Sequence, residues 1–223
     1  MVKVLTFITR KAGMPLDEFQ KYWRERHPDA VTRLPGIRRY VQSHVLPSMY
    51  GKGEPPHDGI AEVWADDTNA LRRMTESPAH PALIEDEARF IDRDKMGVII
   101  TEEHVAVDGT PAPDAIKAVE LLRKRPDMPL DTFHTHWRDR HATLAAKVPG
   151  LRRYVASLVR ASAYGANRAP TYDGAALMWF DSMDAVKSAA GSTEYKAMVS
   201  DRENFQAPGP PPFLLTREHV IVG

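Results

Sequence analysis

The stretch MPLDEFQKYWRERHPDAVTRLPGIRRYV at residues 14–41 occurs a second time in the chain, as MPLDTFHTHWRDRHATLAAKVPGLRRYV at residues 128–155. Trp23 matches Trp137 and Tyr40 matches Tyr154, each 114 positions later. A constant offset over nearly thirty residues indicates an internal duplication. Every other inference from the sequence therefore starts from two copies of one unit.

The duplication extends over the whole chain. Trp64 matches Trp179 at an offset of 115, because the loop between Tyr164 and Tyr172 carries one extra residue. We expect a first repeat at residues 1–107, a linker at 108–113 and a second repeat at 114–223. A unit of ~110 residues is long enough to bury a core of its own.

Composition limits the possible partners. Of 223 residues, Lys and Arg make up 30 and Asp and Glu another 30, so no bulk charge attracts nucleic acid or an anionic membrane. The absence of cysteine excludes disulfides, thiolate metal sites and cysteine nucleophiles. No apolar run reaches the ~18 residues that a membrane span needs, and the first residues lack the apolar core of a signal peptide. We expect a cytoplasmic protein with no nucleic-acid or membrane partner.

Hydrophobic periodicity predicts the same order of elements in each repeat. In the first repeat we expect a strand at 2–9, a helix at 15–34 that bends at Pro28, strands at 37–46 and 60–64, a broken helix at 66–93 and a strand at 97–107. In the second we expect a strand at 115–123, a helix at 129–147, strands at 151–160 and 174–180, a helix at 182–201 and a strand at 214–222. The order β-α-β-β-α-β is that of the ferredoxin-like fold.

Each repeat should form a four-stranded antiparallel sheet with helices on one face only. The bare face must be covered, and the obvious cover is the other copy. The sequence therefore predicts the α+β class, with two ferredoxin-like repeats forming an intramolecular dimeric α+β barrel. The fused halves would stand in for a homodimer, and a further homodimer stays open.

A set of residues in this pattern resembles an EthD-domain protein. They are Phe19, Tyr22, Trp23, His27, Pro35-Gly36, Asp58-Gly59 and Trp64. The resemblance spans both halves and implies a tandem EthD protein of the dimeric α+β barrel superfamily. Relatives there include muconolactone-type isomerases, polyketide cyclases and dehydratases, cofactor-independent quinone-forming monooxygenases and haem-binding enzymes, and an oxidoreductase label often accompanies the EthD name. Fold alone does not choose among these reactions.

His27 is the first candidate for catalysis. It shares a helix face with Phe19 and Trp23, so its imidazole should lie partly buried at the boundary between helix and sheet. Partial burial next to a carboxylate would place its pKa in a working range for proton transfer. The alternative is a structural histidine, which its counterpart His141 in the second repeat favours.

Positions at which the two copies differ give further candidates. Glu62 and His44 are both replaced by leucine in the second repeat. If the helix covers the face of the strand that carries Glu62, this acid could pair with His27 or His44 and complete an acid–base site. The alternative is a structural ion pair between Glu62 and Arg38 or Arg39.

Other side chains are expected to bind the substrate. Tyr22, Trp23, Tyr40 and Trp64 would line the pocket, Arg39 could hold a carboxylate or phenolate, and Tyr50 could act as a lid. The alternatives are an ion pair between the halves for the arginine and a plain exposed loop residue for Tyr50. The counterparts in the second half are His141, Trp137, Tyr154 and Trp179.

Metal and haem sites are not favoured by the spacing of the histidines. His134 and His136 diverge on a helix, and His134 and His141 share a face without a third ligand in register. His219 or His141 could in principle bind a haem iron, but nothing singles either out, and no GxGxxG or P-loop is present.

We therefore expect a cofactor-independent enzyme that acts on a small cyclic, aromatic or polyketide-like metabolite by acid–base proton transfer, as an isomerase, dehydratase or other lyase. One alternative is an oxidoreductase, either a cofactor-free monooxygenase or a haem-dependent enzyme. Another is a non-catalytic protein that binds a small ligand. Because Glu62, His44 and Tyr22 are not repeated, the first half is expected to be the active one.

Overall fold

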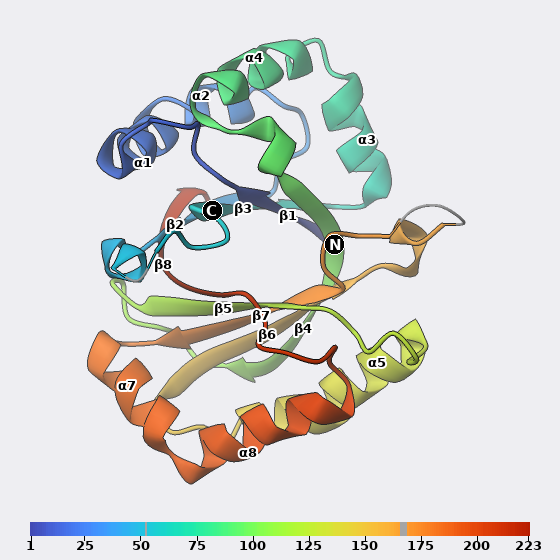
Figure 1. Ribbon diagram of the computed structural model, residues 1–223. Helices are drawn as coiled ribbons and strands as arrows, with labels where there is room; N and C mark the ends of the chain where they lie inside the picture. Colours follow the sequence, from blue (N-terminus) through green and yellow to red (C-terminus); the bar gives the residue numbers. More distant parts are fainter. Residues whose placement is uncertain (52, 166–168) are drawn as a thin grey trace. The chain divides into compact units, whose positions relative to one another are not determined.

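The computed structural model describes residues 1–51, 53–165 and 169–223 (Figure 1). The chain divides into two compact units. Unit 1 comprises residues 1–100 and 218–223, and unit 2 comprises residues 101–217. Residues 166–168, within the loop to which the sequence assigns one extra residue, lie outside the described part.

The first repeat contains every element expected from the sequence. They are β1 (Val2–Ile8), α1 (Leu16–Glu25), α2 (Pro28–Val31), β2 (Arg39–Val45), η1 (Pro47–Tyr50), β3 (Gly59–Ala65), α3 (Thr68–Glu76), α4 (His80–Phe90), η2 (Arg93–Lys95) and β4 (Gly97–Asp108). The predicted break at Ser77-Pro78 separates α3 from α4. The strand β4 extends to Asp108, one residue beyond its expected end.

The second repeat follows the same order. Its elements are β5 (Ile116–Leu122), α5 (Leu130–His136), η3 (Trp137–His141), α6 (Ala142–Ala145), β6 (Leu151–Val159), η4 (Ala161–Ala163), β7 (Gly174–Phe180), α7 (Met183–Gly191), α8 (Thr193–Asp201), η5 (Arg202–Asn204) and β8 (Phe213–Val222). The order β-α-β-β-α-β is thus confirmed twice.

Antiparallel pairing defines the central strands of each unit. In unit 1, β3 lies between β1 and β2, with Glu62 opposite Leu5 on one side and Val41 on the other. In unit 2, β7 lies between β5 and β6, and Leu177 takes the place of Glu62. The hydrogen-bonded order β1-β3-β2-β8-β5-β7-β6-β4 is that of a closed barrel, so the predicted α+β barrel class is confirmed.

Helices cover one face of each three-strand group. In Figure 1 the blue and green helices α1 to α4 lie on one side of β1, β3 and β2, and α5, α7 and α8 lie on one side of β5, β7 and β6. Turns at Pro35-Gly36 and Val148-Pro149-Gly150 return the chain to the sheet. Gly36 has a φ of 85° and Gly150 a φ of 76°, which a residue with a Cβ adopts only under strain.

The cores of the two units are packed differently. In unit 2 the buried apolar side chains under the helices form one continuous cluster that includes Phe133, Trp137 and Phe205. In unit 1 the buried side chains of the same layer fall into separate clusters, one around Phe19 and Trp23, one around Ala70 and one around Val31. The space between the unit 1 clusters is where the candidate site lies.

Candidate functional site: an apolar cavity with a buried histidine

Unit 1 contains a cavity of about 410 Å³ between its sheet and its helices. Strand residues such as Val4, Ala61 and Val63 line one wall, and helix residues such as Leu83 and Ile84 line the other. Ligand pockets for small molecules begin at roughly 300 Å³, are mostly apolar and carry a few placed polar groups. The cavity of unit 1 has these properties, and His27 and Glu87 are among the polar groups on its wall.

His27 is a buried imidazole on the wall of this cavity. The side chain is 6% exposed, and its Nδ1 lies 2.7 Å from Oδ2 of Asp86 on α4. The other oxygen of Asp86, Oδ1, accepts a hydrogen bond of 2.6 Å from the hydroxyl of Tyr22. With Nδ1 donating to the carboxylate, the lone pair of the imidazole is on Nε2, and His27 lines the cavity. Carboxylate and phenol together fix the tautomer and the orientation of the ring.

The local sequence explains why His27 is placed at this point. The N–H groups of Arg26 and His27 both bond to the carbonyl of Tyr22, and Pro28 has no N–H with which to continue the ladder. The helix therefore breaks into α1 and α2 at His27, as Pro28 predicted. In unit 2, Ala142 occupies the position of Pro28, and the chain there passes through the π-helical turn η3 without a break.

Burial lowers the pKa of His27 below its ordinary value of 6.5, and the hydrogen bond and charge of Asp86 oppose this shift. The imidazole is therefore neutral at pH 7 and able to accept a proton. The site therefore offers a neutral imidazole, His27, that is held in one tautomer on the wall of a mostly apolar cavity.

Glu87 is a second ionisable group on the cavity wall. It follows Asp86 on α4, and because side chains of neighbouring helix residues diverge, it faces the cavity while Asp86 binds His27. Burial raises the pKa of Glu87, the charge of Arg93 lowers it and the charge of Asp86 raises it. The cavity thus contains a carboxyl group as well as an imidazole.

Unit 2 has a similar histidine and carboxylate. Nδ1 of His141 lies 3.0 Å from Oδ2 of Asp201, and Nε2 of His136, in the place of Tyr22, lies 3.1 Å from the same carboxylate. Burial raises the pKa of Asp201, but hydrogen bonds from His141, Asn204 and His136 outweigh it and hold the pKa well below its usual range. The ring of His141 packs 4.8 Å from that of Phe205, inside the continuous core.

The EthD profile matches residues 11–94 and 125–209, one match in each repeat. The chain belongs to the EthD domain family. A comparison with curated proteins finds no sequence match.

Solved structures share the fold of this EthD protein at low sequence identity. An anthrone oxidase-like protein superposes with a TM-score of 0.68 at 13% identity, covering 100% of this chain and 94% of that one. A provisionally named monooxygenase from Lactobacillus acidophilus gives a TM-score of 0.55 at 12% identity, covering 99% and 93%. A chlorite dismutase variant from Candidatus Nitrospira defluvii gives 0.55 at 10% identity, covering 99% and 91%. At these identities the likeness establishes the fold alone.

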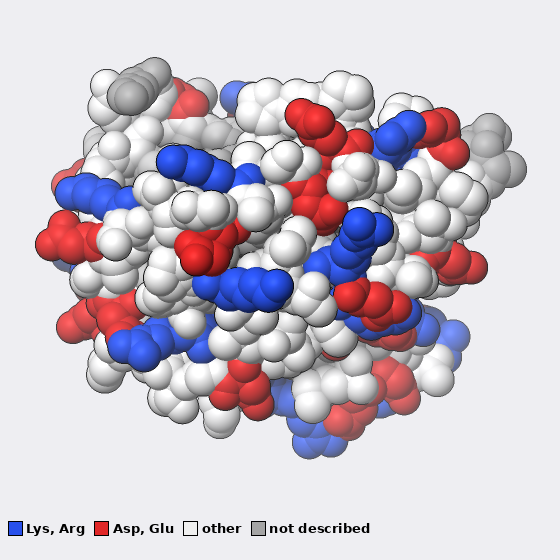
Figure 2. All heavy atoms as spheres, turned by 90° about the horizontal axis from the view of Figure 1, so that it is seen from below, with Lys and Arg blue, Asp and Glu red and all other residues white. Residues whose placement is uncertain are grey.

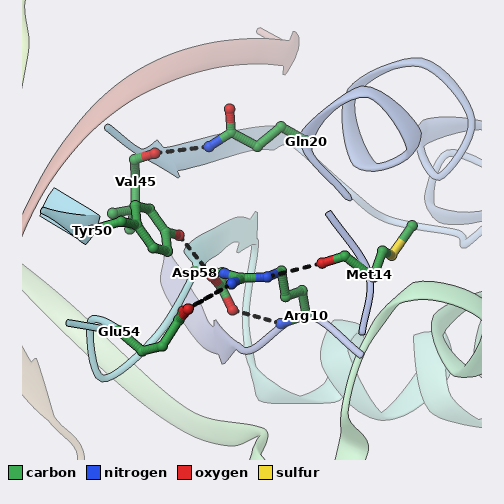
Figure 3. A network of polar contacts seen from close by, with 7 residues as sticks. All are labelled: Arg10, Met14, Gln20, Val45, Tyr50, Glu54 and Asp58. Atoms are coloured by element: carbon green, nitrogen blue, oxygen red, sulfur yellow. Dashed lines mark hydrogen bonds and ion pairs between the residues drawn. The ribbon is translucent and has the colours of Figure 1, made fainter. Parts of the chain in front are cut away.

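The EthD residues Asp58 and Gly59 have structural roles. A Cβ on Gly59 would clash with the indole of Trp23, so only glycine allows α1 to lie this close to β3. Asp58 accepts hydrogen bonds from the backbone N–H of Arg10, from the Arg10 guanidinium and, at 2.6 Å, from the hydroxyl of Tyr50 (Figure 3). Glu54 contacts the same guanidinium at 2.8 Å. Tyr50 therefore fastens its loop to β1 and β3 and does not line the cavity.

Glu62 faces away from the helices and from His27. The predicted pairing of Glu62 with His27 or His44 required the helix to cover the Glu62 face, and this condition is not met. Side chains alternate along a strand, and Ala61 and Val63 face the helices, so Glu62 faces the other side of the sheet. There it forms an ion pair of 2.9 Å with Lys3 and accepts a hydrogen bond of 3.0 Å from Ser43. The partner is Lys3 rather than the expected Arg38 or Arg39.

His44 lies on the helix side but outside the cavity lining. Its ring stacks on that of Trp23 with centroids 4.3 Å apart, and its Nε2 lies 3.0 Å from Oε1 of Gln42. Gln42 in turn donates to the carbonyl of Trp23 at 2.7 Å and to the hydroxyl of Tyr40 at 3.0 Å. Trp23 and Tyr40 do line the cavity, so His44 supports its wall from behind.

The remaining predicted binding residues divide between the two faces. Tyr22 contacts Asp86 rather than the cavity. The Arg39 guanidinium lies over the ring of Trp64 at 5.3 Å, on the face of the sheet that carries Lys3. Neither Arg39 nor Trp64 lines the cavity. In unit 2, Trp137 donates to the hydroxyl of Tyr154 at 2.8 Å in the core, and Trp179 lies beneath Lys117.

Sequence reasoning missed Asp86, Glu87 and Gln42. Asp86 matches Asp201 at the same offset of 115 as the tryptophans, so its repetition was the available signal. Glu87 and Gln42 match Arg202 and Ala156, which are non-repeated positions of the kind that singled out Glu62.

Within the described ranges, no group of three or more His, Asp or Glu residues is arranged to hold a metal ion. The two histidines considered for haem do not fit a site at this cavity: His141 is packed against Phe205, and the ring of His219 lies 4.6 Å from that of His44. No described helix combines the length and hydrophobicity needed to cross a bilayer. On the face seen in Figure 2, acidic and basic side chains are intermingled, in line with the balanced composition.

Proposed function

We propose that this EthD protein is a cofactor-independent oxidoreductase whose first step is removal of a proton from a small, mostly apolar cyclic or aromatic substrate in the unit 1 cavity. The observation that carries the proposal is His27, a neutral, buried imidazole held by Asp86 on the wall of an apolar cavity. The names of the structural relatives, an anthrone oxidase-like protein and a provisionally named monooxygenase, favour oxidation as the outcome.

The proposed chemistry needs only a base and an apolar environment. A CH₂ group activated by a carbonyl and an aromatic ring loses a proton to Nε2 of His27, and the resulting carbanion is electron-rich enough to react with O₂. The overall balance is R₂CH₂ + O₂ → R₂C=O + H₂O, in which the substrate is oxidised and O₂ is reduced. The apolar wall keeps water from protonating the carbanion.

The test uses anthrone as the probe substrate and measures oxygen uptake together with quinone absorbance. We expect turnover by the wild-type protein and a loss of 10²–10⁴-fold in the His27→Gln variant, the range that a general base contributes. His141→Gln is the matched control, because it alters the corresponding histidine in unit 2. Equal turnover by wild type and His27→Gln would refute the proposal. A Soret band in the purified protein would point to haem chemistry instead.

A second candidate is the isomerase or lyase reaction expected from the sequence. It is favoured by the presence of two proton-transferring groups, His27 and Glu87, in one cavity. Such a reaction returns the proton to another atom and consumes no O₂. Substrate conversion that continues at the same rate without oxygen, and that depends on His27, would select this candidate. Binding without any conversion would leave the protein a ligand carrier.

A further inference from the structure

Helix α4 presents one stripe of side chains to the cavity of unit 1. The stripe consists of His80, Leu83, Ile84, Glu87 and, just beyond the helix, Ile91. These positions recur at intervals of three and four, as expected for one helix face. Among the described residues that line the cavity, Glu87 is the one carboxylate, and the proposed proton abstraction by His27 gives it no role.

Glu87 is incompletely satisfied by the protein. Its Oε2 is buried and accepts no hydrogen bond from the described residues. This oxygen forms a long ion pair with Arg93, whose Nε lies 3.6 Å away, beyond good hydrogen-bond distance, and whose side chain is 37% exposed. A buried carboxylate oxygen without a donor is costly, so the site gains free energy from any ligand that supplies one.

In unit 2 the residue that corresponds to Glu87 is held in an ion pair within the protein. Glu87 is replaced by Arg202, and Thr6, on the strand opposite, is replaced by Glu120. Arg202 forms an ion pair with Glu120 in which both side chains are largely buried. In unit 1 the hydroxyl of a threonine faces the same space, and the carboxylate of Glu87 is left to the cavity.

We propose that Glu87 selects the ligand: the unit 1 cavity takes a mostly apolar cyclic or aromatic molecule that carries a hydroxyl group besides the carbonyl that activates its CH₂ group, and this hydroxyl donates its hydrogen bond to the Glu87 carboxylate. The inference rests on the proposed function, since it concerns the same cavity. A neutral hydroxyl fits better than the alternatives. A carboxylate on the ligand would be repelled by Glu87 and Asp86. An ammonium group would bring a second charge into a mostly apolar cavity and lose its hydration there, whereas a hydroxyl donates without that cost.

A pair of probes in which a methyl group replaces the donor hydrogen tests the inference. Binding of 1-naphthol and of 1-methoxynaphthalene is measured by isothermal titration calorimetry on the full chain. A hydrogen bond to a charged group is strong enough that we expect wild type to prefer 1-naphthol by about tenfold or more. In Glu87→Gln, whose neutral oxygen still accepts, the preference should shrink to about threefold. In Glu87→Met it should vanish.

Two further variants serve as controls. Glu85→Gln removes an exposed carboxylate two residues away on the same helix and should leave the preference at its wild-type value. Thr6→Glu combined with Glu87→Arg copies the unit 2 ion pair and should abolish binding of both probes. Equal affinity of wild type for the two probes, or a tenfold preference that persists in Glu87→Met, would overturn the inference.

The outcome is separable from that of the proposed function. If His27→Gln keeps full turnover while Glu87 still sets the naphthol preference, the reaction is wrong and the ligand class stands. If His27→Gln abolishes turnover and the naphthol preference is absent, the reaction stands and the role of Glu87 is refuted.

Discussion

The Asp86→Asn variant tests the proposed role of the His27–Asp86 pair. Its effect on activity can be separated from its effect on stability, because Asp201→Asn makes the same change at the matching pair of unit 2. In Asp86→Asn the single amide oxygen can accept from either His27 or Tyr22, but not as an anion, so two charge-assisted hydrogen bonds of 2.7 Å and 2.6 Å become weaker. Hydrogen bonds to charged groups contribute about 1.5–3 kcal/mol and neutral ones about 1 kcal/mol. We expect a loss of about 2 kcal/mol in the free energy of unfolding.

The catalytic effect follows from the basicity of His27. Asp86 raises the pKa of His27 against the lowering effect of burial, so its removal lowers that pKa further. The imidazole becomes a weaker base, and we expect kcat/KM for anthrone to fall by about 10²-fold, within the range of general-base effects. The low-pH limb of the kcat/KM profile should move to still lower pH, since catalysis needs the neutral form.

The control is Asp201→Asn, which weakens the hydrogen bonds of His136 and His141 in the same way. Urea unfolding should show a loss of similar size in both variants, while stopped-flow or oxygen-electrode assays should show the drop in kcat/KM in Asp86→Asn alone. If both variants lose stability and activity equally, the activity loss is a consequence of destabilisation, and the reasoning about the His27–Asp86 pair is refuted.

Three further changes test how unit 1 is built. Burial above all, with smaller electrostatic effects of His219 and Arg24, lowers the pKa of His44 to about 3, below its unfolded value of 6.5, so stability is present above pH 6.5 and is lost as the pH falls. His44→Leu, which copies the Leu158 of unit 2, should remove about 2 kcal/mol of the loss between pH 6.5 and 5 seen in urea titrations, and an unchanged pH dependence would contradict this. Gly59→Ala should destabilise the protein by about 1–3 kcal/mol through the clash with Trp23, visible as a lower Tm; a Tm equal to that of wild type would show that the helix can shift freely. Glu87→Gln should raise stability at pH 7 and leave it unchanged near pH 3, because burial raises the pKa of Glu87 and the cost of the ionised form appears only as the pH rises above the unfolded value of 4.5.

The repeat and its periodicity were sufficient to predict the fold. The offset between Trp23 and Trp137 established the duplication, and breakers such as Pro28 and Ser77-Pro78 marked where the helices are interrupted. These signals are local, and the helix–sheet layering that they imply does not depend on which face of a strand is which.

The site could be predicted only in part. The burial of His27 between helix and sheet could be predicted, because its helix face is set by Phe19 and Trp23, while its role stays a prediction. The side of the sheet on which Glu62 lies was not evident, because β3 has buried residues on both faces and alternation alone does not say which face the helices cover. Asp86 is 59 positions from His27 and has the sequence context of an ordinary surface carboxylate, so only the tertiary fold shows that they meet.

The substitution of Arg202 for Glu87 is a difference that a protein assembled from two separate identical chains could not acquire. In such an assembly one gene encodes both copies, so any mutation that fills the cavity of one copy also fills the cavity of the other. With both copies in one polypeptide, a mutation alters a single copy. One half is then free to accumulate ion pairs such as Glu120–Arg202, while the other half keeps its cavity.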